Sequence, residues 1–452
     1  MERNESKMDW QRLVSDRRFG LEDYTEHKPG IRSDFQRDYD RLVFSSPFRR
    51  LQNKTQVFPL PGSIFVHNRL THSLEVACVG RSLANEAALL LRERHPGEPW
   101  LPVLDAVGDI VAAGCLAHDL GNPPFGHSGE MAISTFFSEG AGAVLEKEFT
   151  PEQWADFTHF DGNANAFRLL TNRFEGRRPG GFAMTYSTLA SIVKYPFQST
   201  LAGGKNKFGF FDSERESFER VATHLGMLRL DAPDGAMRYA RHPLVYLVEA
   251  ADDICYEVMD IEDAHKLKLI STPEAIDHFL GFFDDATKDR RRRAMARVTD
   301  PNEQLAYLRS CVIGTLVESC ARAFADNEDA ILAGQLKGQL LDHIGPLERE
   351  GYRSCSTLSW ERIYTTPDVV DIELAGNRII TFLMERLIHA VRNPDLNYSR
   401  LLLSKVPQQY AVRADNLYGQ IQAVIDHVSG MTDVYALDLY QKLNAMNLKI
   451  NN

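Results

Sequence analysis

The sequence predicts an all-α protein, and three observations support this. Apolar residues recur at three- and four-residue spacing through much of the chain, as they do along one face of a helix. The alternation of apolar and polar residues that is typical of strands is scarce. The 452 residues are 44% hydrophobic and 25% charged, which is typical of a folded globular protein with a large core or two lobes.

Helices can be placed in order from this spacing and from their start signals. One helix opens within residues 67–75 and continues through the apolar position Leu91. Further helices are expected over residues 103–117, 243–260, 273–283 and 374–391. Pro243 and Pro273 stand near helix starts, where a missing N–H does no harm. Residues 56–65 could supply a short hairpin, the one β-structure that we expect.

Three regions follow from this pattern. Residues 1–44 form a highly charged N-terminal extension that could reach across to a neighbouring subunit. Residues 45–270 form a helical core, and residues 271–452 form a helical C-terminal lobe.

Composition narrows the function classes. The net charge of −11 argues against a protein whose main task is coating nucleic acid, but it does not exclude a local basic patch. The six cysteines show no C-x-x-C spacing and sit mostly in apolar stretches, which predicts reduced core residues of a cytoplasmic protein. The first residues have no apolar signal region, and no run approaches the ~20 apolar residues of a membrane span.

The strongest functional signal is residues 118–130, which read HDLGNPPFGHSGE. The His118-Asp119 pair ends an apolar helix, where both side chains can lean toward a point just off the helix terminus. An imidazole nitrogen and a carboxylate oxygen at such a point are suited to a metal ion. Two prolines then end the helix and fix a turn, so His127 and Glu130 can return toward the same point.

A carboxylate pair, Asp252-Asp253, ends the almost wholly apolar run of residues 244–251. Burying such a pair is costly unless it is ion-paired or metal-bound, and the alternative is a solvated pair where the helix emerges. Asp252 shares one helix face with Tyr256 and Asp260, four and eight residues on, whereas Asp253 points roughly 100° away. Asp252 is therefore the better metal ligand, and Asp253 has a supporting or capping role.

These residues carry a family resemblance. The order H…HD…D with the turn at residues 118–130 resembles the HD-type phosphohydrolases. More narrowly, the chain is similar to the bacterial deoxyguanosine triphosphate triphosphohydrolases. Five further blocks match that family in the right order: RRLQ (49–52), KTQVF (54–58), RLTHS (69–73), EAADDI (249–254) and SGMTD (429–433). The likeness covers nearly the whole chain and implies an all-α HD-domain metallohydrolase.

The resemblance implies one divalent metal per subunit, Mn²⁺ or Mg²⁺. Its ligands map to four residues: His72, His118, Asp119 and Asp252. Two imidazoles and two carboxylates suit Mn²⁺, Mg²⁺, Fe²⁺ or Ni²⁺ better than a thiolate-loving metal, and an octahedral ion keeps two positions for substrate and water. Some HD hydrolases carry another histidine where this sequence has Asn122, a departure that favours a single metal. The Asn122 amide could donate to a phosphate oxygen or cap the turn.

The family's reaction is attack on the α-phosphorus, which releases tripolyphosphate and a nucleoside. The resemblance makes His127 the acid or base, oriented by Glu130, and adds His159 at the phosphates. Further positions are expected at the substrate: Arg69 and Lys194 at the phosphates, Gln56, Tyr256 and Asp260 at the deoxyribose, and Glu373 and Arg400 at guanine. For each of these the alternative is an ordinary surface charge or core side chain.

The expected substrate is a deoxynucleoside triphosphate, with dGTP preferred, and the resemblance implies a homo-oligomer, commonly a hexamer. The Arg290–Arg293 run reads as a solvated helix face, or as a surface for single-stranded nucleic acid or a neighbouring subunit. A dNTP effector is a further candidate partner. The basic loop at residues 203–209 is either a lid or an ordinary loop. The alternatives to this enzyme are an HD phosphodiesterase or nucleotidase, and a dNTP-sensing module without turnover.

Overall fold

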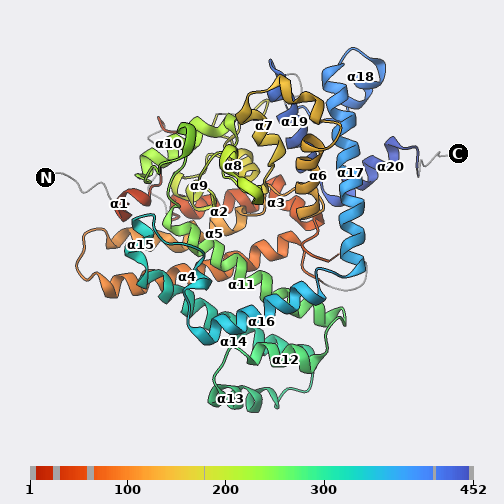
Figure 1. Ribbon diagram of the computed structural model, residues 1–452. Coiled ribbons are helices and arrows are strands. Elements are labelled where there is room, and N and C mark those ends of the chain that lie inside the picture. Colours follow the sequence, from red (N-terminus) through yellow and green to blue (C-terminus); the bar gives the residue numbers. More distant parts are fainter. Residues whose placement is uncertain (1–6, 24–30, 59–65, 178, 411–413, 447–452) are drawn as a thin grey trace.

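The computed structural model describes residues 7–23, 31–58, 66–177, 179–410 and 414–446. These residues form α-helices α1 to α20 (Figure 1). In the described part, β-pairing is limited to isolated bridges such as Thr55 with Asn68. The all-α prediction is confirmed. Most of the expected hairpin, residues 59–65, lies outside the described residues.

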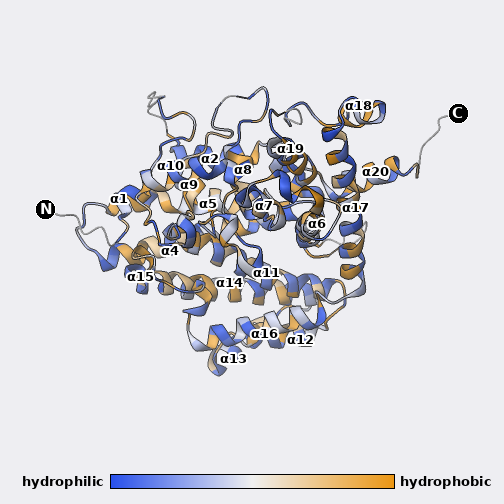
Figure 2. Ribbon diagram, turned by 45° about the horizontal axis from the view of Figure 1, so that its top comes forward, coloured by the Kyte–Doolittle hydropathy of each residue, from blue (hydrophilic) through white to orange (hydrophobic). Residues whose placement is uncertain are grey.

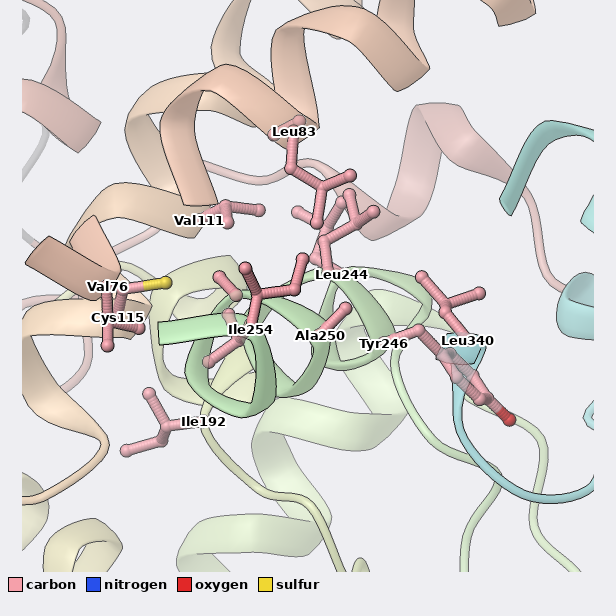
Figure 3. Packing of buried hydrophobic residues seen from close by; sticks show 14 of the residues in the cluster. Val76, Leu83, Val111, Cys115, Ile192, Leu244, Tyr246, Ala250, Ile254 and Leu340 are labelled. Atoms are coloured by element: carbon pink, nitrogen blue, oxygen red, sulfur yellow. The ribbon is translucent and has the colours of Figure 1, made fainter. Parts of the chain in front are cut away.

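The centre of the molecule is built from four helices: α4 (Arg69–Arg94), α5 (Val107–Ala117), α11 (Pro243–Lys266) and α14 (Pro301–Asp326). Every α5 residue except Asp109 is buried, because its sequence is apolar on all sides. Figure 3 shows side chains from three of these helices meeting in this core, Val76 and Leu83 with Val111 and Ile254. A Cβ at Gly80 would lie 2.5 Å from Cys115 Sγ, so glycine permits the close approach of α4 to α5.

The N-terminal helices pack against this core. They are α1 (Trp10–Leu13), α2 (Asp34–Val43) and α3 (Ser46–Arg50). Trp10 is buried and its indole N–H donates to Glu328 Oε1 at 2.8 Å. The described part of residues 1–44 thus packs against its own chain, and a reach toward a neighbouring subunit stays a prediction.

The helices between α5 and α11 cover one side of the core. They are α6 (Gly126–Ser138), α7 (Pro151–Thr158), α8 (Gly162–Thr171), α9 (Tyr186–Ser191) and α10 (Arg215–Leu225). Short 3-10 helices fill several connections: Leu51–Asn53, Leu101–Ala106, Ala143–Glu148, Ser199–Leu201, Gly203–Lys205, Asp212–Glu214, Pro233–Gly235 and Leu340–Asp342. The helix expected from residue 103 accordingly begins as a 3-10 turn and becomes α-helical only at Val107.

The residues after 270 divide between two cores. Three helices extend the first core, α12 (Thr272–Leu280), α15 (Glu328–Leu332) and α16 (Pro346–Arg362), and α13 (Asp285–Met295) lies against α14. Four others, α17 (Pro367–Arg392), α18 (Asn397–Leu403), α19 (Leu417–Ser429) and α20 (Asp433–Leu443), build a second core with α6 and α7. Figure 1 shows α17 as a long helix along one side, with α18 at one end.

Surface character follows this arrangement. Helices such as α17 and α11 show both hydrophobic and hydrophilic residues in Figure 2, as expected where one side packs on the protein. α13 carries the Arg290–Arg293 run and buries no residue. None of the helices in the described ranges is both long and apolar enough to cross a membrane.

Candidate active site and metal centre

Two histidines and two carboxylates converge where α4, α5 and α11 meet. His72 lies in the first turn of α4, whose start is fixed by the capping side chain of Asn68. His118 and Asp119 follow the last residue of α5, and Asp252 lies within α11. His72 Nε2 is 2.9 Å from Asp252 Oδ1, and His118 Nε2 is 3.4 Å from the same oxygen.

Three of these side chains, His72, His118 and Asp119, could hold a divalent cation, and Asp252 lies beside them. Ligand atoms of His72, His118 and Asp119 all lie within 4.8 Å of one another, the one such group among the described residues. His118 Nδ1 donates to the Cys115 carbonyl at 2.6 Å, which leaves the lone pair of Nε2 facing the group. His118 Nε2 is buried without a hydrogen-bond partner, as expected for a ligand atom. The nitrogen and carboxylate donors suit Mn²⁺ or Mg²⁺.

The carboxylates of this group are held in their charged form. Burial would raise the pKa of Asp252, but the charges and hydrogen bonds of His118 and His72 place it well below the usual value. Burial likewise opposes ionisation of Asp119, and Arg69 and His118 outweigh it, so its pKa is also lowered. Burial lowers the pKa of His118, whereas the two carboxylates raise it to about 9 overall. Metal binding would therefore release a proton from His118.

Asp119 is fixed by two neighbours. Arg69 Nη1 donates to its Oδ2 at 2.8 Å, and Asn122 Nδ2 donates to its Oδ1 at 2.5 Å. Arg69 is itself buried and lines the adjacent pocket. The Asn122 side chain was expected to contact a phosphate oxygen or to cap the turn. In the structure its amide instead orients the carboxylate of Asp119, one of the predicted metal ligands.

His127 and Glu130 lie in the first turn of α6, at the same pocket. His127 Nδ1 is 3.1 Å from Glu130 Oε2, and Glu130 Oε1 accepts the Gly162 N–H at 2.7 Å. The hydrogen bond that His127 donates to Glu130 raises the pKa of His127. Burial would raise the pKa of Glu130, but His127 and Lys207 outweigh it and lower that pKa. The chain enters α6 through Phe125 at φ +62°, a left-handed conformation that costs about 1–2 kcal/mol.

A pocket of about 250 Å³ lies against both the predicted metal ligands and the His127–Glu130 pair. Its walls include five sequence-predicted metal or acid/base residues and three cations: His118, Asp119, Asp252, His127, Glu130, Arg69, Lys194 and Lys207. Lys194 pairs with Glu249 at 3.0 Å, and Lys207 pairs with Asp161 at 3.2 Å and with Glu130 at 3.4 Å. Lys207 was not singled out from the sequence; the basic loop at residues 203–209 was its only signal.

A second group of polar residues adjoins His72. The Tyr256 ring lies 6.4 Å from the His72 ring, and the Tyr364 hydroxyl donates to Asp260 Oδ2 at 2.6 Å. The rings of Tyr256 and Tyr364 lie 6.0 Å apart. Gln56 Oε1 is buried without a hydrogen-bond partner. No sequence pattern pointed to Tyr364, because 104 positions separate it from Asp260.

Like Gln56, Tyr256 and Asp260, three further predicted residues lie outside the pocket wall. His159 ends α7, its Nδ1 is 3.1 Å from the Ala155 carbonyl, and burial lowers its pKa. Arg400 is exposed in α18 and donates to the Asp395 carbonyl at 2.7 Å. Glu373 is exposed in α17, where its carbonyl accepts the Ser128 hydroxyl at 2.6 Å, so it lies close to the start of α6.

Comparison with known proteins gives two family matches. The HD domain model matches residues 69–195, and the phosphohydrolase-associated domain model matches residues 353–442. A deoxyguanosinetriphosphate triphosphohydrolase-like protein of Pseudomonas aeruginosa is 39% identical over 96% of this chain and 98% of its own length. One of Synechocystis sp. is 37% identical over 98% and 100%. A deoxyguanosinetriphosphate triphosphohydrolase of Yersinia enterocolitica is 28% identical over 96% and 98%.

Proposed function

The chain belongs to the HD-domain family of deoxyguanosinetriphosphate triphosphohydrolases, and on that premise we propose that it is a metal-dependent enzyme that hydrolyses deoxynucleoside triphosphates, dGTP preferentially, to the deoxynucleoside and tripolyphosphate. One observation carries the proposal. Two imidazoles and two carboxylates meet beside an oriented His–Glu pair, in a pocket whose wall holds three cations.

Four side chains would hold the metal, namely His72, His118, Asp119 and Asp252. A Mn²⁺ or Mg²⁺ ion bound there, one per subunit, would polarise a phosphoryl group and activate water. Arg69 and Asn122 keep the Asp119 carboxylate oriented toward the ion.

Different residues of the pocket bind the triphosphate and transfer the proton. Arg69, Lys194 and Lys207 supply positive charge for the triphosphate. His127 exchanges the proton, because Glu130 holds its Nδ1 and so leaves Nε2 available. A sensing module would need no oriented acid/base pair, which argues against that alternative. His159 would contact the phosphates only after a rearrangement, since it lines no part of the pocket wall.

Selection of the sugar and base would use residues outside this pocket. Tyr256 adjoins His72, where an aromatic ring under the deoxyribose would exclude a 2′-hydroxyl, and we propose that Asp260 and Gln56 bind the sugar. Tyr364 holds Asp260 in place by its hydroxyl. At guanine we propose Glu373, which is near the start of α6, and Arg400.

Arg400 donates to a carbonyl of its own chain and does not line the pocket. To contact guanine it would have to reach the pocket of a neighbouring subunit, and we propose that the protein is a homo-oligomer, a hexamer. All six cysteines are unpaired, which supports a cytoplasmic enzyme. Arg291 packs over Phe283 and Tyr307 in the α13 region, which leaves its neighbours Arg290, Arg292 and Arg293 for nucleic acid, an effector or another subunit.

The test is product identification with purified protein, each dNTP and NTP, and Mn²⁺ or Mg²⁺. In ¹⁸O-water, attack on the α-phosphorus places the label in intact tripolyphosphate and none in the nucleoside. Orthophosphate or pyrophosphate as the first product would instead support a phosphodiesterase or nucleotidase.

Metal analysis of three variants tests the ligand set. His118→Ala and Asp252→Ala should lose both bound metal and turnover, since each removes one of four ligands. Asp253→Asn is the matched control. Burial raises the pKa of Asp253 to about 8, so the neutral amide replaces a largely neutral acid, and metal content should stay normal. Normal metal content in both His118→Ala and Asp252→Ala would overturn the ligand set.

A further inference from the structure

Segments from three parts of the chain meet at one carboxylate, Asp433, at the start of α20. Its Oδ2 accepts the Thr55 N–H at 2.8 Å and the Thr55 hydroxyl at 2.6 Å. Its Oδ1 accepts the Phe125 N–H at 2.9 Å. Asp433 is 8% exposed, and 378 and 308 positions separate it from these partners. One C-terminal side chain thus joins the segment before α4 to the turn before α6.

Phe125 is a residue whose conformation must be held from outside. It is left-handed, with φ +62°, and it directly precedes Gly126 and His127. A residue with a Cβ persists in this conformation only where its surroundings impose it. Asp433 accepts the N–H of Phe125 from one side. The Phe125 side chain lies against Gly376 of α17, where an added Cβ would come within 2.7 Å of Phe125 Cβ. The direction in which α6 starts, and hence the position of His127, depends on these contacts.

The other end of the same turn is attached to the same C-terminal segment. Lys54 Nζ is buried and donates to the Asn122 carbonyl at 2.6 Å and to the Ser429 carbonyl at 2.8 Å. The first residues of α6 are attached to α17 as well, through the hydroxyl of Ser128. Residues 122–128 are therefore held at both ends by the C-terminal helices.

We propose that Asp433, supported by Lys54, is a positioning residue for His127: it fixes the turn at residues 122–127 and so sets where the imidazole stands against the nucleotide. The C-terminal helices then complete the active site in addition to packing on it. The effect on rate rests on the proposed function, whereas the attachment itself can be measured without it.

The test is Asp433→Asn in the full-length protein. The amide has only one accepting oxygen, so it cannot serve Thr55 and Phe125 together. We expect kcat to fall about 10²-fold, because small misplacements of catalytic groups cost that much, while KM and metal content change little. The matched control is Asp438→Asn on the same helix, whose half-exposed carboxylate pairs with Lys442 at 2.6 Å; this variant should leave kcat unchanged.

A double variant separates positioning from loss of folded protein. If Asp433 acts through His127, Asp433→Asn should cost little more in a His127→Ala background, because residues that act as a unit are not additive. Gly376→Ala displaces Phe125 from the opposite side without touching Asp433 and should reproduce the same selective fall in kcat. A loss of equal size in both backgrounds, or unchanged kcat in Asp433→Asn, overturns the proposal.

Hydrogen exchange gives a readout that needs no turnover. The amides of Asn122 and of residues 125–128 should exchange faster in Asp433→Asn than in the wild type and in Asp438→Asn. Unchanged exchange there overturns the attachment even if the enzyme is active. A wild-type protein that hydrolyses no nucleotide contradicts the proposed function instead, and faster exchange in Asp433→Asn would then still support the attachment.

Discussion

Glu130→Gln tests the proton-transfer assignment most directly. Both Glu130 oxygens are used, by Gly162 on one side and by His127 and Lys207 on the other. Glutamine keeps the shape and can still accept from Gly162, but it presents an NH₂ group to His127 Nδ1. That nitrogen must then accept a hydrogen bond, so the imidazole proton moves to Nε2. The ring becomes the wrong tautomer for taking a proton from the pocket.

The size of the effect follows from these contacts. Losing a positioned acid/base group costs ~10²–10⁴ in rate, or about 3–5 kcal/mol, and His127→Ala should show this full loss. Glu130→Gln keeps the imidazole, so its loss should be smaller, about 10²-fold. Metal content should stay normal, since Glu130 is outside the metal group. Stability should fall by only about 1 kcal/mol, because Lys207 keeps Asp161 as a partner.

The assay is kcat and KM as a function of pH for both single variants and the double variant. Glu130 raises the pKa of His127, so the limb of the profile that belongs to His127 should move to lower pH in Glu130→Gln. The double variant should resemble His127→Ala. Wild-type turnover in Glu130→Gln, or a double variant that multiplies the two single losses, would refute the reasoning.

Two further predictions concern selectivity and pH. Tyr256→Ala should lower the preference for dGTP over GTP, measured as the ratio of kcat/KM values, by about 10–10²-fold; an unchanged ratio would exclude the ring from sugar selection. His242 is fully buried, donates to the Leu13 carbonyl at 3.0 Å and accepts the Leu244 N–H, and burial lowers its pKa to about 4. The unfolded chain takes up this proton near pH 6.5, so stability should decrease as pH falls, by about 2 kcal/mol from about pH 7 to about pH 5. His242→Asn should remove this pH dependence, and the asparagine can still cap α11. The measurement is the free energy of urea unfolding as a function of pH, and the same pH dependence in the wild type and the variant would contradict the prediction.

The parts of the fold and site that follow local rules could be predicted from the sequence. Helix periodicity predicted the all-α fold, and Pro243 does begin α11. Helix phase also separated Asp252 from Asp253, and Asp252 is the residue that approaches His72 and His118. The prolines after Asn122 predicted a turn that returns to the same point, and His127 and Asp119 line one pocket. Each of these inferences uses neighbours within about two helical turns, where backbone geometry alone fixes direction.

The remaining site residues depend on contacts that no local pattern encodes. Tyr364 reaches Asp260 across 104 positions, and Lys207 reaches Glu130 across 77. Arg400 was predicted at guanine from the family resemblance, but the sequence could not reveal that its guanidinium binds the Asp395 carbonyl of its own chain. Periodicity says which face of a helix is buried, but not which other helix covers it, so such pairings need the packed structure.

The metal-binding half and the proton-transfer half of the proposed site belong to different hydrophobic cores. The metal group comes from α4, α5 and α11 of the first core, whereas His127 begins α6, which belongs to the second core with α17, α19 and α20. The turn at residues 118–127 is the covalent link between them. A small shift between the cores would therefore change the distance from His127 to the metal group and leave the geometry of each half intact. A ligand or subunit that binds α17–α20 should accordingly alter kcat more than metal affinity, because His127 belongs to a helix of the second core, whereas the metal-binding side chains lie on or directly after helices of the first core.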